Sequence, residues 1–298
     1  MNIDRTVNGP LAAHLLDLLD ALEGQDIPLI LVGGFGLFLR REWLLETGTK
    51  TLFERVPESR ATEDFDLVLR LELLADLMKM TGLRAAFDAL GYRVVENAQI
   101  YQFIKPGTAW GNARDIKIDL LARKPGEGDP KLKTDSRRVK PSDKNSPLHA
   151  HITPEAIAVE DDLLEIDLDG SRTDGTPSRG KIFLPCAYAM YLMKLFAFRD
   201  EHEGVKPGDR QRYAAKHALD LYTITALLTL AERDGLPTFQ ERYGDHPIAR
   251  EAGQIVKKYF AEPNAMGVLR LRDNAVLLEP ANLTSFIAIL GTTFPAND

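Results

Sequence analysis

The sequence is very poor in cysteine, since Cys186 is the single one among 298 residues. One thiol cannot close an internal disulfide, and it excludes a zinc cluster built from cysteines. Low cysteine usage is compatible with a reducing compartment. We expect Cys186 itself to pack as a small buried hydrophobe.

The sequence also has no long apolar stretch. No run approaches the roughly 18 consecutive apolar residues that a membrane-spanning helix needs. The opening MNIDRTVNGP lacks the basic region followed by an apolar one that is typical of a secretory signal. We therefore expect no membrane association and a cytoplasmic location.

An excess of positive charge is absent as well. There are 37 Lys and Arg residues against 44 Asp and Glu, a net charge of -7, so the overall balance does not indicate a nucleic-acid-binding protein. Two nucleotide-binding motifs are also missing: no Gly-Lys-Ser/Thr is present, which excludes a P-loop, and the GGFG at 33–36 lacks the spacing of a dinucleotide fingerprint. Hydrophobic residues make up 44%, which is enough to build an ordinary globular core.

The hydrophobic pattern indicates a mixed first part of the chain. Leucines over 11–22 have the spacing of an amphipathic helix, and the apolar run 27–32 predicts a buried strand that ends in a tight turn at Gly33-Gly34. A helix follows over 35–46, and another is expected over 71–90, with Gly91 ending it. Further strands are expected at these positions: 64–69, 92–96, 100–105, 116–122, 163–168 and 181–184.

From Pro185 onward the pattern is helical. We therefore expect an α+β domain over 1–184 and an all-helical domain over 185–298. The expected helices of the second domain are 186–200, 209–233, 247–260 and 280–291.

Two acids open the strand at 64–69. Side chains at i and i+2 of a strand point to the same face, so Asp64 and Asp66 lie together while Phe65 and Leu67 face the other way. Neighbouring carboxylates repel one another unless a cation or a shared proton relieves the repulsion. Magnesium prefers oxygen ligands, so a divalent metal is the obvious relief.

Asp119 is a third acid in an apolar strand, IKIDLLA at 116–122. If this strand pairs beside 64–69, the three carboxylates converge and can hold two magnesium ions. The alternative is that the acids are solvated strand-end groups, or partners of Arg60 and Lys117. The pair Gly33-Gly34 adds weight to the first interpretation, since a glycine turn before a helix lets backbone N–H groups approach a phosphate. A simple tight turn is the alternative explanation of that pair.

Together these features resemble the polymerase-β-like nucleotidyltransferase superfamily. Within it the sequence most resembles the AbiEii/AbiGii group, the toxins of type IV toxin–antitoxin systems. The resemblance covers roughly residues 25–225, and the last 70 or so residues match nothing we can name. The matching stretches are LVGGFGLFL (31–39), RATEDFDLVL (60–69), IKIDLLA (116–122), MKLFAFRD (193–200) and KHALDLY (216–222).

The resemblance implies a fold, a reaction and a set of site residues. The fold would be a small mixed sheet with flanking helices, followed by the helical domain. Gly33, Gly34 and Thr62 would bind the nucleoside triphosphate. Asp64, Asp66 and Asp119 would bind Mg²⁺ or Mn²⁺, with Asp119 also helping to deprotonate the acceptor hydroxyl. Two further residues would act from the helical domain: Lys194 on phosphate charge, and Asp220 in orienting that lysine or the acceptor.

The helical residues also have simpler explanations. Lys216 and Asp220 are four apart, the spacing of an intrahelical salt bridge, and Lys194 and Arg199 fit ordinary surface charges. The segment 123–147 has eight Lys or Arg residues against four acids. It is either a solvated loop or a contact for the phosphates of RNA or of the nucleotide.

The leading interpretation is an enzyme that moves a nucleoside monophosphate from an NTP to a hydroxyl acceptor and releases pyrophosphate. The resemblance suggests RNA, such as a tRNA 3′ end, as the acceptor and an antitoxin protein as a partner. One alternative is a small-molecule nucleotidyltransferase of the aminoglycoside-modifying type. Another is a catalytically silent binding module on the same fold, against which the three carboxylates argue.

Overall fold

The computed structural model describes the chain except for Arg5, Glu63 and residues 59–61, 97–99, 110–111, 205–208, 273–278 and 297–298. The chain forms two compact units. The first contains Met1–Glu46 and Arg60–Cys186, and the second contains Thr47–Ser59 and Ala187–Asp298. None of the described helices has the length and apolarity needed to cross a bilayer.

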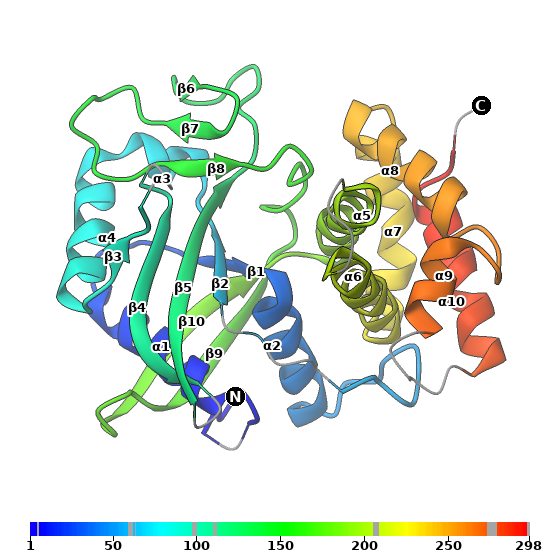
Figure 1. The fold of residues 1–298 in the computed structure, drawn as a ribbon, viewed down its shortest axis with the longest axis horizontal. Helices are drawn as coiled ribbons and strands as arrows, with labels where there is room; N and C mark the ends of the chain where they lie inside the picture. Colours follow the sequence, from blue (N-terminus) through cyan, green and yellow to red (C-terminus); the bar gives the residue numbers. More distant parts are fainter. Residues whose placement is uncertain are drawn as a thin grey trace. The chain divides into compact units, whose positions relative to one another are not determined.

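One sheet organises the first unit (Figure 1). The ten strands of its described residues follow the order β6-β7-β8-β5-β2-β1-β10-β9, with β4 also paired to β5 and β3 paired to β4. The strands are β1 (Ile30–Val32), β2 (Asp64–Val68), β3 (Arg93–Val94), β4 (Gln102–Ala109), β5 (Asn112–Ala122), β6 (Lys133–Thr134), β7 (Arg138–Lys140), β8 (Ala150–Ile152), β9 (Leu164–Ser171) and β10 (Pro177–Leu184).

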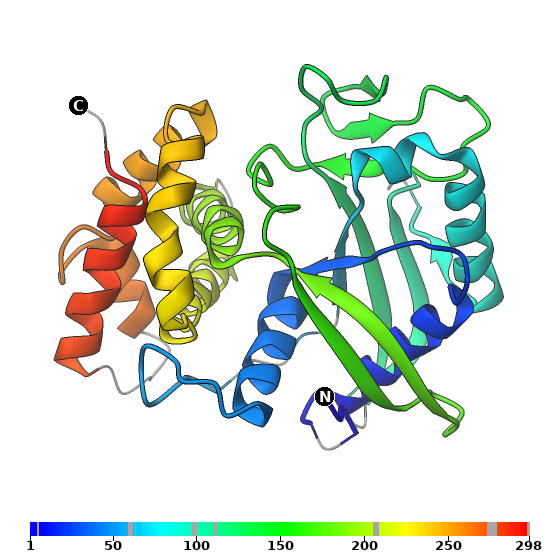
Figure 2. The same cartoon turned by 180° about the vertical axis from the view of Figure 1, so that it is seen from behind.

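The described residues of this unit form four helices: α1 (Gly9–Ala21), α2 (Gly33–Glu46), α3 (Leu71–Ala75) and α4 (Leu77–Ala89). Helix α1 packs against β9 and β10, and α2 packs against β1 and β2 (Figure 2). Aromatic contacts fix which sheet face the helices cover. The ring of Phe35 on α2 meets Phe65 of β2 edge-on at 5.5 Å, and Phe87 on α4 lies 4.7 Å from Phe103 of β4.

The single helix expected over 71–90 is wrong. It is two helices, because Asp76 leaves helical geometry with φ -88° and ψ 102° and its carboxylate accepts hydrogen bonds from the backbone N–H groups of Met78 and Lys79. An aspartate in this position caps a new helix and competes with continuation of the old one. Gly91 does follow α4 with φ +79°, the left-handed conformation expected after a helix.

The segment 123–147 is also more ordered than its composition suggests. Strands β6 and β7 pair with each other, and β7 pairs with β8, which extends the sheet beyond β5. Strands β6 and β7 have two and three residues, which is too few to show a hydrophobic period in the sequence. They are recognised only by their pairing in the sheet.

Six helices make up the described part of the second unit: α5 (Ala187–Glu203), α6 (Asp209–Ala226), α7 (Leu230–Tyr243), α8 (Pro247–Tyr259), α9 (Met266–Arg272) and α10 (Pro280–Thr293). The expected helix over 209–233 is wrong at its end. Thr229 and Glu232 form a reciprocal capping box, in which each side chain accepts from the other's backbone N–H, and this starts α7 as a separate helix. Both α7 and α9 were missed by the hydrophobic spacing.

Residues 47–59 belong to the helical unit although they precede the site strands in sequence. The backbone N–H of Leu52 donates to the carbonyl of Leu228 at 2.7 Å, and Phe53 packs its ring 5.4 Å from that of Tyr222. The chain therefore enters the helical unit, returns to the sheet and enters the helical unit again at Ala187.

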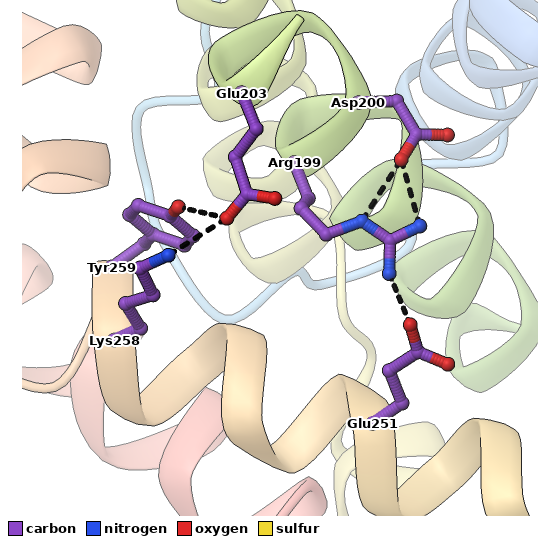
Figure 3. A network of polar contacts seen from close by, with 6 residues as sticks. All are labelled: Arg199, Asp200, Glu203, Glu251, Lys258 and Tyr259. Carbon is purple, nitrogen blue, oxygen red and sulfur yellow. Dashed lines mark hydrogen bonds and ion pairs between the residues drawn. The ribbon is translucent and has the colours of Figure 1, made fainter.

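Charged side chains join α5 to α8 (Figure 3). The guanidinium of Arg199 donates to Asp200 on its own helix and to Glu251 on α8. One turn further along α5, Glu203 accepts from Lys258 at 2.8 Å and from the hydroxyl of Tyr259. The network spans two helices at their solvent-exposed edge.

Candidate active site

The strand register brings the three predicted acids to one place on the sheet. Strand β2 pairs in parallel with β5, and in this register Asp66 is the direct partner of Asp119 and Asp64 is the partner of Lys117. On the other side, β2 pairs antiparallel with β1, where Asp66 is opposite Val32. Asp66 thus lies between the residue that precedes the glycine pair and the third acid.

The acids occupy one face of the sheet and the apolar residues occupy the other. Asp64, Asp66 and Asp119 are half-buried, whereas the alternate residues are completely buried: Phe65, Leu67, Ile116, Ile118 and Leu120. Because α2 and α4 contact Phe65 and Phe103 on the apolar face, the carboxylates lie on the opposite face of the sheet from these aromatic contacts. The expected separation into an acidic and an apolar face is present.

Asp64 has a fixed partner. The hydroxyl of Thr62, itself 3% exposed, donates to Oδ1 of Asp64 at 2.7 Å. A hydrogen bond to a carboxylate of this length is charge-assisted and restricts the side chain's rotation. The contact makes Thr62 a residue that orients Asp64, and its expected contact with the nucleotide stays a prediction.

Asp119 has the most perturbed environment of the three. Burial raises its pKa, and the nearby Asp64 carboxylate raises it further, while a hydrogen bond from Gln102 and the charge of Lys117 lower it. The Asp64 carboxylate is therefore close enough to Asp119 for its negative charge to act on it. The site is therefore one electrostatic unit.

Gly33 contacts the acid site directly. Its φ is +71°, and a Cβ atom built on it would lie 1.9 Å from Oδ2 of Asp66 and 2.8 Å from that carboxyl carbon. No real Cβ approaches another atom so closely, so only glycine leaves room for the Asp66 carboxylate at the start of α2. The helix begins at Gly33 itself, without the intervening turn that the sequence predicted.

The donor set suits a hard divalent cation. Asp64, Asp66 and Asp119 supply only carboxylate oxygens, which is the chemistry that Mg²⁺ and Mn²⁺ select. Over the described residues, no group of three or more Asp, Glu, His or Cys side chains is arranged as a metal site. Metal binding by these three acids stays a prediction, and it would draw the carboxylates closer together.

Two residues that precede β2 in the sequence lie outside the described residues. Arg60, considered as a partner for the acids, is one, and Glu63 between Thr62 and Asp64 is the other. Lys117 is described: its Cα is in register with Asp64, and its ammonium lowers the pKa of Asp119.

In the helical unit, Lys194 and Asp220 form a close ion pair. Nζ of Lys194 lies 2.7 Å from Oδ2 of Asp220, with 10% and 4% of the two side chains exposed. His217 is nearby, with Nδ1 3.8 Å from the same oxygen and 20% of its side chain exposed. The predicted orientation of Lys194 by Asp220 matches this contact. The phosphate role of Lys194 stays a prediction.

Two other charged residues of this unit have partners of their own. Arg199 binds Glu251 and Asp200 and lies 4.6 Å from the ring of Phe196, so it fixes α5 to α8 rather than standing as an isolated surface charge. The ammonium of Lys216 lies 4.7 Å over the ring of Tyr213.

The basic segment 123–147 is partly neutralised. Arg123 donates two hydrogen bonds of 2.6 Å to Asp129 and one of 3.2 Å to Glu160. Arg138 and Lys140 both bind Asp135, at 2.8 and 2.6 Å. Five cations of the segment are exposed: Lys124, Lys131, Lys133, Arg137 and Lys144.

Comparisons with known proteins add little to this picture. No family model matches the sequence, and no curated protein matches it. Among solved structures, the chain is similar to the solution structure of the antibiotic-resistance factor ANT(2'')-Ia, described as having substrate-regulated conformation dynamics. Sequence identity is 15%, the alignment covers 80% of this chain and 100% of the other, and the TM-score is 0.36. These comparisons assign the chain to no family.

Gln102 is a site residue that the sequence analysis missed. It is half-buried and bonds the carboxylate of Asp119, which is its direct register partner across the β4–β5 hairpin. Both residues lie in strands that the sequence predicted, 100–105 and 116–122, but their pairing was not predicted. The contact follows only from the register, because a slip of one residue would place Gln102 on the other face.

Proposed function

We propose that this protein is a metal-dependent nucleotidyltransferase that moves a nucleoside monophosphate from an NTP to a hydroxyl acceptor. The observation that carries the proposal is the contact between Gly33 and Asp66. It joins a glycine-started helix, whose N–H groups suit phosphate, to an acidic sheet face, whose carboxylates suit a divalent cation.

The reaction needs little covalent chemistry from the protein. The acceptor oxygen attacks the α-phosphorus, a new P–O bond forms, the bond to the oxygen bridging to the β-phosphorus breaks, and pyrophosphate leaves. Catalysis then consists mainly of positioning and charge stabilisation. In this proposal Asp119 accepts the proton of the acceptor hydroxyl, Thr62 and Gln102 hold Asp64 and Asp119 in place, and the first N–H groups of α2 bind phosphate oxygens.

A divalent cation held by Asp64, Asp66 and Asp119 would supply charge neutralisation for the triphosphate and the leaving group. The resemblance adds Gly34 and Lys194 to the residues that contact phosphate. It also adds Asp220, through its ion pair with Lys194.

Transfer of radiolabel from each α-labelled NTP tests the proposal. The assay compares wild type with Asp66→Asn, in the presence of Mg²⁺ or Mn²⁺, on total tRNA and on a panel of small hydroxyl compounds. The matched control is Asp167→Asn, the same substitution at an exposed acid of the edge strand β9. We expect transfer by wild type and the control and its loss in Asp66→Asn, because one carboxylate less weakens cation binding. Transfer that survives in Asp66→Asn, or none from any NTP to any acceptor, contradicts the proposal.

For the acceptor we propose RNA, such as a tRNA 3′ end, in the setting of a toxin with an antitoxin partner. The five exposed cations of 123–147 support this choice, since phosphate contacts are made by Lys and Arg. The matched test replaces Lys131, Lys133 and Lys144 together by Gln. We expect weaker transfer to RNA and a shallower salt dependence, with unchanged use of the NTP in pyrophosphate exchange.

The small-molecule acceptor is the alternative outcome of the same experiment. RNA binding weakens steeply as salt rises, because neutralised phosphates release counterions, whereas binding of a small acceptor with few charges depends less on salt. Transfer to a small hydroxyl compound that is insensitive to the triple substitution would favour the alternative.

A further inference from the structure

A cavity opens in the first unit away from the acidic face of the sheet. It has a volume of about 440 Å³ and lies between the N-terminal segment, the first turns of α1, strand β4 and the turn that joins β9 to β10. Its polar wall residues include Asp4, Thr6, His14, Ser171, Arg172 and Thr173. A cavity of this volume is in the range of small-molecule sites.

An ionic cluster underlies the wall at His14. Asp17, 9% exposed, accepts hydrogen bonds from the N–H and the hydroxyl of Thr173 at 3.1 and 2.7 Å. Lys105 places its Nζ 3.9 Å from Oδ2 of Asp17 and 4.7 Å from the ring centre of Tyr92. His14 has Nδ1 3.8 Å from the same Asp17 oxygen, so it joins the cluster to the cavity.

His14 contributes a neutral imidazole to the cavity wall. Nδ1 is buried and makes no hydrogen bond, since its distance to Asp17 is longer than a hydrogen bond. Burial, and after it the charge of Lys105, lower the pKa of His14 to about 4, against the opposing effect of Asp17. At neutral pH the imidazole is therefore uncharged and carries one lone pair that can accept from a donor.

The described charges around the cavity are predominantly negative. Four carboxylates, those of Asp4, Asp17, Asp20 and Asp174, stand against the two cations Arg172 and Lys105. Arg172 already binds Asp20 and, at 3.3 Å, Asp174, and Lys105 is paired with Asp17. Asp4 remains as the acid on the cavity wall. Its oxygens accept from the N–H and hydroxyl of Ser171, at 2.8 and 2.9 Å, and keep further lone pairs.

We propose that this cavity is a second binding site, which takes a small molecule with a primary ammonium group. The ammonium donates to the Asp4 carboxylate beside the neutral imidazole of His14, while the hydroxyls of Thr6 and Thr173 bind the rest of a polar ligand. An anion is disfavoured because it would meet Asp4 at the wall and find Arg172 already paired with two acids.

The site is distinct from the candidate active site. Gly107, which lines the cavity, is five residues along β4 from Gln102, which bonds Asp119. Five residues of strand span about 16 Å. The ammonium site therefore does not depend on the proposed transfer reaction, and it can be tested without it.

Three four-carbon probes separate the ligand classes: 1,4-diaminobutane as the dication, 1,4-butanediol as the neutral compound and succinate as the anion. Each is titrated into the full chain, and binding is followed by ligand-observed NMR. The first variant is Asp4→Asn, which removes the charge and keeps an oxygen acceptor. The second is Ala13→Leu, which fills the cavity from α1, and its matched control is Ala21→Leu, on the same helix but away from the cavity wall.

We expect the diamine to bind at least about tenfold more tightly than the diol or succinate, and Asp4→Asn and Ala13→Leu each to weaken it about tenfold or more, with Ala21→Leu unchanged. Thermal melts confirm that all variants are folded. Diamine binding that Ala13→Leu leaves intact would show general attraction to an acidic protein, and would overturn the proposal. Tighter binding of succinate, or no diamine binding up to about 10 mM, would overturn it equally.

Discussion

The substitution Gly33→Ala probes the contact that joins the glycine pair to the acidic face. An alanine with φ near +71° has left-handed strain of about 1–2 kcal/mol. Its Cβ would also lie 1.9 Å from Oδ2 of Asp66, so the carboxylate must leave its rotamer, at a further cost of about 0.5–1.5 kcal/mol. The expected loss of unfolding free energy is about 2–3 kcal/mol, a large fraction of the stability of a typical domain but not all of it.

Gly91→Ala is the matched control. Gly91 lies in the same unit, has φ +79° and has no atom within 4 Å of a built Cβ, so an alanine there meets the backbone strain alone. We expect it to lower the free energy of unfolding by about 1–2 kcal/mol. The difference between the two variants isolates the collision with Asp66.

Tryptophan fluorescence during urea unfolding is the assay, because Trp43, one of the two tryptophans of the sequence, lies on α2, the helix that begins at Gly33. The second readout is the rise in melting temperature that Mn²⁺ produces. We expect Gly33→Ala to lose this rise and Gly91→Ala to keep it, since ligand binding to the folded state stabilises it only if the site is intact. Equal behaviour of the two variants in both measurements would refute the reasoning.

Three further predictions follow from the contacts of the two units. His14 has a pKa of about 4 when folded and about 6.5 when unfolded, so the unfolded chain binds its proton first and stability falls as pH drops from 6.5 to 4. We expect this group to contribute about 1–2 kcal/mol of the fall after solvent screening, and His14→Gln to remove that part in urea titrations across the same pH range. Lys194→Met leaves Asp220 buried without its cation and should lower the unfolding free energy of the helical unit by about 3–5 kcal/mol, followed by circular dichroism. Adding Asp220→Leu should recover part of that loss, and a strictly additive double variant would contradict the pairing. Glu251→Gln breaks one arm of the exposed Arg199 network and should change stability by no more than about 1 kcal/mol in the same assay.

The sequence predicted the elements that carry the site. Alternation of acids with Phe65 and Leu67 indicated a strand with one polar face, and the apolar run before Gly33 indicated the strand that precedes α2. These patterns are local, since the pleat alone sends neighbouring side chains to opposite faces. The wrong helix boundaries came from capping residues. Asp76 and Thr229 start new helices at positions where the hydrophobic spacing alone predicted that the preceding helix continues.

The sequence by itself therefore determined which residues of a strand or helix share a face. It also determined where the mixed α+β pattern gives way to a purely helical one. Only the tertiary structure decided that β2 lies between β1 and β5, which makes Asp66 the neighbour of both Gly33 and Asp119 and Gln102 the partner of Asp119. It also decided that residues 47–59 join the helical unit and that His14 meets Lys105 beside a cavity. The physical reason is that spacing fixes side-chain direction within one element, whereas contacts between elements distant in sequence depend on register and packing, which no single segment encodes.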